Sequence, residues 1–339
     1  MSTPAERNAA AVEGAAEAAK QGARLGLDAD DPIDIFGVIE ESKVWLLFER
    51  LERLYGFFQR EDDDVAGIVL NSGHPLSLQR FTAAHEYGHY VLGHSASQDG
   101  ENEVLGGGAM PLQEIQAQSF AAEFLMPLRL VNLALDRLSL PREPANIDPV
   151  SAYQLSLEIG ASYRATISRL NQLNKISYPL ANGLRSYEPM QMKLEVGAGR
   201  APENSRAAVW ALNHELGGRH LELRTEDELH VRLTEIPSSG YRWNLEAEVG
   251  GLEVIEDELE RSDVPGGRFG SKVTRHLRCR ALEPGAGVLQ LSLIRDWEGS
   301  DRDPVDRIAL PLIVQAPPTG LESPTGIVLP QRQALLAEA

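Results

Sequence analysis

The sequence predicts an α+β protein in which a helical part with a small sheet precedes an all-β sandwich. Before about residue 194, apolar residues mostly recur at helical spacing, as over residues 79–92 and 112–126, and residues 66–71 have the pattern of a short strand. After that point the pattern changes to short alternating segments separated by Gly, Pro, Ser and Asp, which is typical of an antiparallel β-sandwich. We therefore expect two folded domains of different class.

The same patterns divide the chain into successive segments. An Ala-rich start with interspersed Glu, Lys and Arg predicts a helix that is exposed or loosely docked, or else a flexible segment. The expected divisions are an N-terminal helix or flexible segment (1–31), a first folded domain (32–180) with a pair of helices inside it (148–173), a linker (181–204), a β-sandwich (205–316) and a flexible tail (317–339).

Composition and charge narrow the classes of function. The 339 residues include 50 Asp and Glu against 32 Lys and Arg, so the formal net charge is −18. Such a chain repels phosphate backbones, so we interpret the helical pair as structural and expect no direct binding of nucleic acid. The single cysteine, Cys279, excludes an intramolecular disulfide and a zinc site built from several cysteines. No apolar run has the length of a membrane span, which predicts a cytoplasmic protein with no membrane partner.

The most informative stretch for chemistry is His85-Glu86-Tyr87-Gly88-His89. Two histidines four apart on a helix project from one face about one turn apart, so both can bind one Zn²⁺. Glu86 directly follows the first histidine and can act as general base on a water molecule at the metal. Apolar neighbours on both sides predict a buried helix, in which this trio needs a partner. The pattern therefore predicts an HExxH metal site in the core of the first domain.

A catalytic zinc needs a third protein ligand and an open fourth position. His94 is one candidate, but the motif that uses a third histidine has Ser95 at that position and Leu92 where its glycine is expected. Glu114 and Glu123 are better candidates, but their spacing sets them about 180° apart around one helix, so only one can face the metal. Spacing alone leaves the choice between the two carboxylates open.

Two motifs carry a family resemblance: residues 81–89 read FTAAHEYGH, and residues 120–127 read FAAEFLMP. Over roughly residues 32–180 the chain resembles the ImmA/IrrE family of bacterial zinc metallopeptidases, whose motifs are FTxAHELGH and ExEANxFAAxLLMP. The resemblance implies that Glu114, at the first Glu of the second motif, is the third zinc ligand. The chain departs from the motifs at Tyr87, Gln116 and Gln118, and none of these is a ligand or the base.

The resemblance also implies a reaction. Zn²⁺ held by His85, His89 and Glu114 polarises a water molecule and the scissile carbonyl, while Glu86 takes the proton and delivers it to the leaving amine. The implied substrates are proteins, typically transcriptional repressors, although other members of the family work as toxins. Mn²⁺ or Fe²⁺ in place of zinc stays open, because two histidines and a glutamate bind all three ions.

A short apolar strand pattern suggests where a protein substrate binds. Ile68, Val69 and Leu70 precede a Ser-Gly turn, and we expect them to form an edge strand onto which an extended substrate pairs. An ordinary core strand is the alternative interpretation of the same residues.

Three loop-like clusters in the sandwich combine glycine with an aromatic or Arg anchor, which favours protein recognition at one end of the domain. The residues concerned are Gly240, Tyr241, Trp243, Gly266, Gly267, Arg295 and Trp297. In order along the chain, these clusters resemble the loops of the chagasin family of cysteine-peptidase inhibitors, NPTTGYxW, a Gly-Gly loop and RPW. The resemblance implies an immunoglobulin-like fold. Core positions at strand ends are the alternative for the two tryptophans.

The leading hypothesis is a zinc endopeptidase whose β-sandwich serves recognition or regulation. The chain departs from the chagasin loops at Ser238, Ser239 and Asp296, inside the segments that would fill a protease cleft, so we favour recognition over inhibition. Two rival hypotheses stay open. One is a binding or regulatory protein that does not cleave, and the other is a cysteine-peptidase inhibitor that acts through residues 205–316.

Overall fold

The computed structural model describes residues 2–52, 54–61, 65–94, 110–213, 221–245, 251–260, 272–295, 297 and 303–316. The chain forms two compact units that divide after Ser186. In the described part, the first unit mixes helices with a small sheet, and the second contains two sheets and one α-helix. None of the helices in these ranges combines the length and the apolar character that crossing a bilayer requires. The mixed helix-and-sheet class that the sequence predicts is confirmed.

Three strands form the sheet of the first unit, with β3 (Val65–Asn71) between β1 (Trp45–Glu49) and β2 (Gly56–Glu61). β3 runs parallel to β1 and antiparallel to β2. The expectation that Ile68, Val69 and Leu70 form an edge strand is therefore wrong. Both sides of β3 already pair with neighbouring strands, so no backbone groups remain for an added strand.

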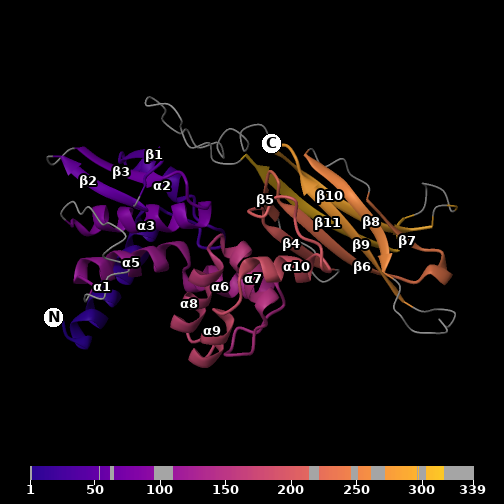
Figure 1. The fold of residues 1–339 in the computed structure, drawn as a ribbon, viewed down its shortest axis with the longest axis horizontal. Helices are drawn as coiled ribbons and strands as arrows, with labels where there is room; N and C mark the ends of the chain where they lie inside the picture. Colours follow the sequence, from indigo (N-terminus) through magenta and orange to yellow (C-terminus); the bar gives the residue numbers. More distant parts are fainter. Residues whose placement is uncertain are drawn as a thin grey trace. The chain divides into compact units, whose positions relative to one another are not determined.

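Helices stack against this sheet in successive layers (Figure 1). α3 (Leu76–Leu92) contacts β2 and β3, and α5 (Leu112–Leu125) packs on α3. Gly88 allows this second contact to be close, because a Cβ at its position would lie 3.0 Å from the ring of Phe120. α1 (Pro4–Arg24) in turn packs on α5. The predicted helices over 79–92 and 112–126 are thus adjacent in space.

α1 is tightly packed, contrary to the expectation of an exposed or loosely docked helix. Ala10, Gly14 and Ala18 recur every four residues along one face and are buried. A Cβ on Gly14 would lie 2.1 Å from the backbone carbonyl oxygen of Gln116, so the two helix backbones are in direct contact. A stripe of small residues, which reads as polar and Ala-rich in the sequence, here makes a close helix–helix interface.

The remaining described helices of the first unit are short, and a side chain caps the N-terminus of each except the helix over residues 128–137. α7 (Pro149–Ile159) and α8 (Tyr163–Gln172) occupy the positions of the expected helical pair. Asp148 and Ser162 accept hydrogen bonds from the first turns of these helices, and Gly160 ends α7 with a left-handed φ of +70°. Arg169 of α8 is buried and paired with Glu123, so its charge does not face outward for a phosphate backbone. These helices are α2 (Ile35–Glu41), α6 (Leu128–Arg137), α7 (Pro149–Ile159), α8 (Tyr163–Gln172) and α9 (Tyr178–Leu184).

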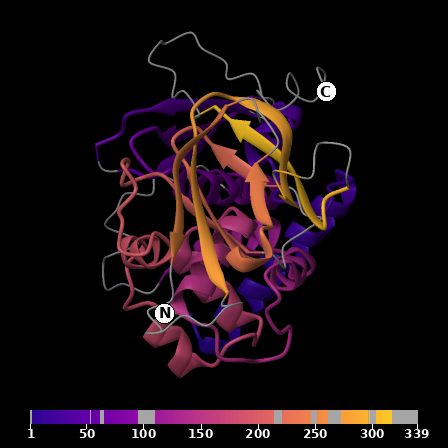
Figure 2. The ribbon, with the colours of Figure 1, turned by 90° about the vertical axis from the view of Figure 1, so that its right-hand side faces the viewer.

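The second unit is a sandwich of two four-stranded sheets (Figure 2). One sheet has the order β4 (Val209–Asn213), β6 (Glu228–Glu235), β9 (Val273–Ala281) and β8 (Leu252–Glu260). The other has the order β5 (Leu221–Arg224), β11 (Asp306–Gln315), β10 (Gly285–Ile294) and β7 (Arg242–Leu245). Neighbouring strands are antiparallel except for the pairs β4–β6 and β5–β11. These sheets agree with the predicted β-sandwich.

Part of the expected linker, residues 181–204, is helical and packed. α10 (Pro189–Val196) belongs to the second unit. The Lys193 ammonium is buried and donates to the carbonyl oxygens of Ser205 (2.9 Å) and Ala207 (2.5 Å), while Arg232 donates to the carbonyl of Val196 (3.3 Å). These bonds fix α10 to the start of the sandwich. The expected tail, residues 317–339, lies outside the described residues.

Candidate functional site

Three side chains with metal-ligand chemistry converge between α3 and α5. His85 and His89 lie one turn apart on α3, and Glu114 comes from the first turn of α5. His85 Nε2 lies 3.0 Å from Glu114 Oε2, His89 Nε2 lies 3.3 Å from Glu114 Oε1, and the two Nε2 atoms are 3.1 Å apart. The close packing at Gly88 is what brings the two helices near enough for these contacts.

The spacing of these donor atoms fits a tetrahedral metal ion. Zinc bonds to nitrogen and oxygen are about 2.0–2.1 Å long, so two ligand atoms of one tetrahedron are about 3.3 Å apart. The three observed spacings of 3.0–3.3 Å agree with that value. Within the described ranges, His85, His89 and Glu114 are also the one group of three such residues close enough to share an ion. Two histidines and a carboxylate leave one tetrahedral position open.

The pKa shifts of His85 and Glu114 suit the binding of a cation. Burial lowers the pKa of His85, which favours the neutral imidazole. Burial raises the pKa of the Glu114 carboxyl, but hydrogen bonds and charge interactions with His85 and His89 outweigh it and leave that pKa below its ordinary value. Neutral imidazole and ionised carboxylate are the forms in which these side chains bind metal.

Glu86 is placed on the same helix, one residue after the first histidine. Its side chain is only 3% exposed. A carboxylate held in so dry a position, next in the chain to a candidate metal ligand, is suited to accept a proton from a water molecule. Of the other polar side chains near the motif, Tyr87 directs its hydroxyl elsewhere, toward Gln21 Nε2 (2.6 Å) and Ser42 Oγ (2.8 Å).

His94, the third candidate histidine, contacts the far side of His89 instead of joining the ligand group. Gly93 ends α3 with φ +70°, and the His94 N–H then bonds back to the His89 carbonyl at 3.0 Å. This left-handed helix end returns His94 to His89, and their Nδ1 atoms are 2.9 Å apart. Sequence reasoning missed this contact, although the glycine directly before His94 is the signal for it.

The other carboxylate that spacing left open, Glu123, faces away from the ligand group. It pairs with Arg169, which also donates to the Met126 carbonyl at 2.8 Å. Glu123 therefore joins α5 to α8, while Glu114 at the other end of α5 meets the two histidines. Because the two glutamates lie half a turn apart around α5, only one of them faces the histidines, as their spacing in the sequence predicts.

At one end of the sandwich, four of the expected recognition residues form one cluster. The Arg295 guanidinium lies 4.2 Å from the centre of the Tyr241 ring and 6.0 Å from that of Trp297, and it donates to the Ser239 carbonyl at 3.0 Å. Trp297 is 69% exposed and lies directly on Gly240, where a Cβ would be 2.1 Å from the indole ring. The glycine therefore makes room for an exposed aromatic surface.

The other expected loop residues divide between the core and the part that is not described. Trp243 is 1% exposed, and its indole N–H donates to the Thr234 carbonyl at 3.2 Å, so it belongs to the sandwich core. This agrees with the alternative of a core tryptophan at a strand end. Gly266 and Gly267 lie outside the described residues.

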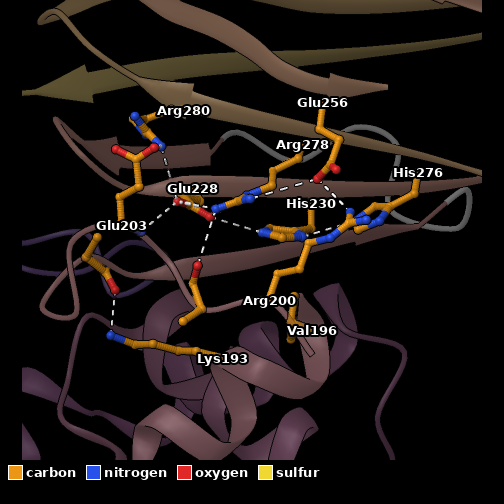
Figure 3. Close-up of polar contacts among 12 residues, drawn as sticks. Lys193, Val196, Arg200, Glu203, Glu228, His230, Glu256, His276, Arg278 and Arg280 are labelled. Carbon is orange, nitrogen blue, oxygen red and sulfur yellow. Dashed lines mark hydrogen bonds and ion pairs between the residues drawn. The ribbon is translucent and has the colours of Figure 1, made fainter. Parts of the chain in front are cut away.

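A buried charge cluster in the sandwich had no counterpart among the sequence predictions (Figure 3). Glu228 is 1% exposed and accepts hydrogen bonds from Arg278 at 2.9 and 3.0 Å, while His230 Nε2 lies 3.3 Å away. His230 Nδ1 in turn lies 3.0 Å from His276 Nε2. Burial raises the pKa of Glu228, but His230 and Arg278 outweigh it and hold that pKa at about 2. These bonds join β6 to β9, so we interpret the cluster as structural.

Two family models match the chain. One, described as an IrrE N-terminal-like domain, matches residues 39–171. The other, described as the Chagasin family peptidase inhibitor I42, matches residues 222–310. Among known proteins, Amoebiasin-2 of Entamoeba histolytica is 23% identical over 109 residues, which make up 32% of this chain and 88% of that protein.

Solved structures give matches of similar extent. The crystal structure of the cysteine protease inhibitor EhICP2 from Entamoeba histolytica matches with 21% identity and a TM-score of 0.30, over 32% of this chain and 97% of that chain. The solution structure of Amebosin matches with 18% identity and a TM-score of 0.26, over 32% of this chain and 98% of that chain. The two family models thus match separate parts of the chain, the IrrE N-terminal-like model residues 39–171 and the chagasin-family inhibitor model residues 222–310.

Proposed function

We propose that the first unit is a zinc-dependent endopeptidase that cleaves a protein substrate. The observation that carries this proposal is the spacing of 3.0–3.3 Å among His85 Nε2, His89 Nε2 and the Glu114 carboxylate, beside the buried Glu86. The match of residues 39–171 to the IrrE N-terminal-like domain supports it independently. A gluzincin-like site, which combines the HExxH motif with a glutamate ligand, accounts for both the spacing of the side chains and the family match.

The candidate metal ligands and Glu86 have separate roles in the proposed reaction. A zinc ion, when bound by His85, His89 and Glu114, supplies Lewis-acid polarisation of the scissile carbonyl and of a water molecule. Glu86 accepts the proton that this water loses as its oxygen attacks the carbonyl carbon. Glu86 then returns the proton to the amine nitrogen when the C–N bond breaks, so the carboxylate is regenerated. Mn²⁺ and Fe²⁺ suit the same ligands.

The strand order suggests which backbone a substrate pairs with. β2 and β1 are the edges of the sheet, and of the two it is β2 that packs on α3, the helix of the candidate ligands. An extended peptide added along β2 would pair with an edge strand that packs on the helix of the candidate ligands, and it would gain backbone hydrogen bonds independent of its sequence. We propose β2 as the substrate edge in place of Ile68, Val69 and Leu70. A transcriptional repressor is the substrate class that the ImmA/IrrE resemblance implies.

Metal content is the test of the site. Purified wild-type protein is expected to hold about one zinc per chain, and His89→Ala and Glu114→Ala are expected to lose it, because each removes one of three ligands. Glu123→Ala is the matched control on α5, since its carboxylate pairs with Arg169 away from the ligand group. Zinc retained in Glu114→Ala, or no zinc in the wild type after reconstitution, would contradict the site.

Glu86→Gln tests the chemistry separately from metal binding. The amide cannot accept the proton of the attacking water, so cleavage of a fluorescently labelled casein or peptide mixture is expected to fall at least about 100-fold. Zinc content is expected to stay at the wild-type level because Glu86 is not a ligand. Equal cleavage by the variant and the wild type would reject the mechanism. Zinc binding without cleavage by either protein would favour the rival hypothesis of a binding protein that does not cleave.

For the sandwich we propose recognition of a protein partner through the cluster of Gly240, Tyr241, Arg295 and Trp297. Its exposed tryptophan and stacked arginine are the residue types that dominate protein interfaces. Inhibition of a cysteine peptidase is the second candidate, favoured by the match of residues 222–310 to the chagasin inhibitor family. Titrating the full chain, as Glu86→Gln, against papain-like enzymes separates the two. Inhibition that Trp297→Ala abolishes would establish the second candidate, and its absence at micromolar concentration would favour the first.

A further inference from the structure

We propose that α1 positions the candidate metal ligand His89 through a chain of hydrogen bonds. The chain runs from His89 through His94 and Gln116 to Glu13 on α1, and we call His94, Gln116 and Glu13 the α1 relay. The inference rests on the proposed metal site, because the relay acts on one of its ligands. All three are positioning residues, since none is among the groups that would bind the metal.

The distances along the relay are those of hydrogen bonds at every step. His89 Nδ1 lies 2.9 Å from His94 Nδ1, and His94 Nε2 lies 3.1 Å from Gln116 Oε1. The Gln116 amide nitrogen then donates to Glu13 Oε2 at 2.8 Å. His89 and His94 are 1% and 7% exposed, so water does not compete effectively for the first bond.

Only one arrangement of protons satisfies the whole relay when His89 binds a metal. The Nε2 atom of His89 faces His85 and Glu114, so Nε2 is the ligand atom and Nδ1 carries the ring proton. His94 must then accept at Nδ1 and carry its own proton at Nε2, which donates to the Gln116 carbonyl oxygen. The amide group of Gln116 ends the series by donating to the Glu13 carboxylate. Each group donates in the same direction, away from the metal ligand.

The backbone around the relay is built for close approach at both ends. At Gly93 the left-handed turn returns His94 to His89. At Gly14, next to Glu13, a Cβ would lie 2.1 Å from the Gln116 carbonyl oxygen, so glycine is what lets α1 reach α5 here. A second bond ties the same helix to the motif, since Gln21 Nε2 donates to the Tyr87 hydroxyl at 2.6 Å. α1 is thereby attached to the HExxH helix directly through Gln21 and indirectly through Gln116 and His94.

The expected effect is on metal affinity. A bond to the second ring nitrogen of a metal-bound histidine fixes its tautomer and ring orientation and raises its basicity, and removing such a bond typically costs about 10–100-fold in affinity. The relay also gives a use to Gln116, which departs from the Glu of the ImmA/IrrE motif. An amide can accept from His94 and donate to Glu13, whereas a carboxylate at the same position would repel Glu13.

The test measures zinc affinity of the full chain by competition with a chromogenic chelator. Gln116→Leu and His94→Phe are expected to weaken zinc binding roughly 10–100-fold. Gln116→Glu is expected to weaken it because two carboxylates then face each other, and adding Glu13→Gln is expected to restore the wild-type affinity, since the new amide can donate to the new carboxylate. Glu17→Gln is the matched control on α1, because Glu17 pairs with Lys20 and not with the relay.

A spectroscopic measurement tests the relay without any need to measure enzymatic activity. In zinc-loaded protein labelled with ¹⁵N-histidine, we expect the ring proton of His89 on Nδ1 and that of His94 on Nε2. The opposite tautomer of His94, or zinc affinity unchanged in both Gln116→Leu and the Gln116→Glu protein, would overturn the relay while leaving the metal site intact. If the wild type takes up no zinc, the proposed function fails and the relay has no ligand to position. The double variant Gln116→Glu with Glu13→Gln keeps the test decisive even if His94→Phe does not fold.

Discussion

At the scale of single residues, Glu228 is a buried charge whose lowered pKa makes the stability of the sandwich depend on pH. Its pKa is about 2, against an ordinary value of 4.5, because the attraction of His230 and Arg278 outweighs the cost of burial. A carboxyl whose pKa is lower in the folded than in the unfolded state stabilises the fold above its unfolded pKa. That contribution is lost as the pH falls from about 4.5 toward about 2.

Glu228→Gln is therefore expected to lower the free energy of unfolding of the sandwich by about 3 kcal/mol at pH 7, and by less than half as much at pH 3. Urea unfolding followed by tryptophan fluorescence measures both values. Glu253→Gln is the control, because Glu253 is an exposed carboxylate on the edge strand β8 of the same sheet and is expected to change stability little. The same loss at both pH values would show that the effect of Glu228 does not come from its charge.

Gly240 is a second residue whose role can be isolated. Its φ of +80° favours glycine, and a Cβ would lie 2.1 Å from the Trp297 ring, so Gly240→Ala is expected to displace that ring. In protein labelled with fluorotryptophan, the ¹⁹F resonance of Trp297 should shift while that of the buried Trp243 stays. Gly199→Ala is the matched control, since φ is +88° there and no atom lies within 4 Å. Equal spectra for the Gly240 variant and the wild type would contradict the contact.

At the scale of secondary-structure elements, the interface of α1 with α5 depends on one glycine. Gly14→Ala places a methyl group against the Gln116 backbone and is expected to destabilise the docked helix, although alanine favours an isolated helix by about 1 kcal/mol. Gly22→Ala on the same helix meets no atom within 4 Å and is expected to stabilise it slightly. Hydrogen exchange of α1 amides measures both changes. Faster exchange of the α1 amides in the Gly22 variant, or an unchanged exchange rate in the Gly14 variant, would contradict the interface.

The secondary-structure elements and their packing differ in how well the sequence predicts them. The helix of His85 and His89 could be predicted because a four-residue spacing is a local property. The partner Glu114 could be named only through the family resemblance, since which face of α5 meets α3 depends on packing at Gly88. The predicted edge position of Ile68-Val69-Leu70 was wrong, because the order of strands in a sheet is set by contacts between residues distant in the chain. The docking of α1 was missed because its small residues carry little hydrophobic signal.

At the scale of the whole molecule, the chain comprises two units with separate buried cores. The first is built around Tyr87, Phe120 and Leu155, and the second around Trp243 and Leu310. All three candidate metal ligands belong to the first unit. A ligand that binds only the folded state stabilises the cooperative unit that contains its site. Zinc is therefore expected to stabilise the first unit more than the second.

This expectation can be measured by hydrogen exchange on the full chain before and after treatment with a zinc chelator. Removing the metal is expected to speed exchange in α3, in α5 and in the part of α1 that carries the relay, because His89 then loses the bond that orders it. The strands β6 and β9 are expected to exchange as before, since Glu228 and Arg278 hold them together whether or not zinc is present. His89→Ala supplies the control, as its exchange should not respond to the chelator. A chelator effect on β6 and β9 as large as that on α3 would mean that metal binding stabilises both units together.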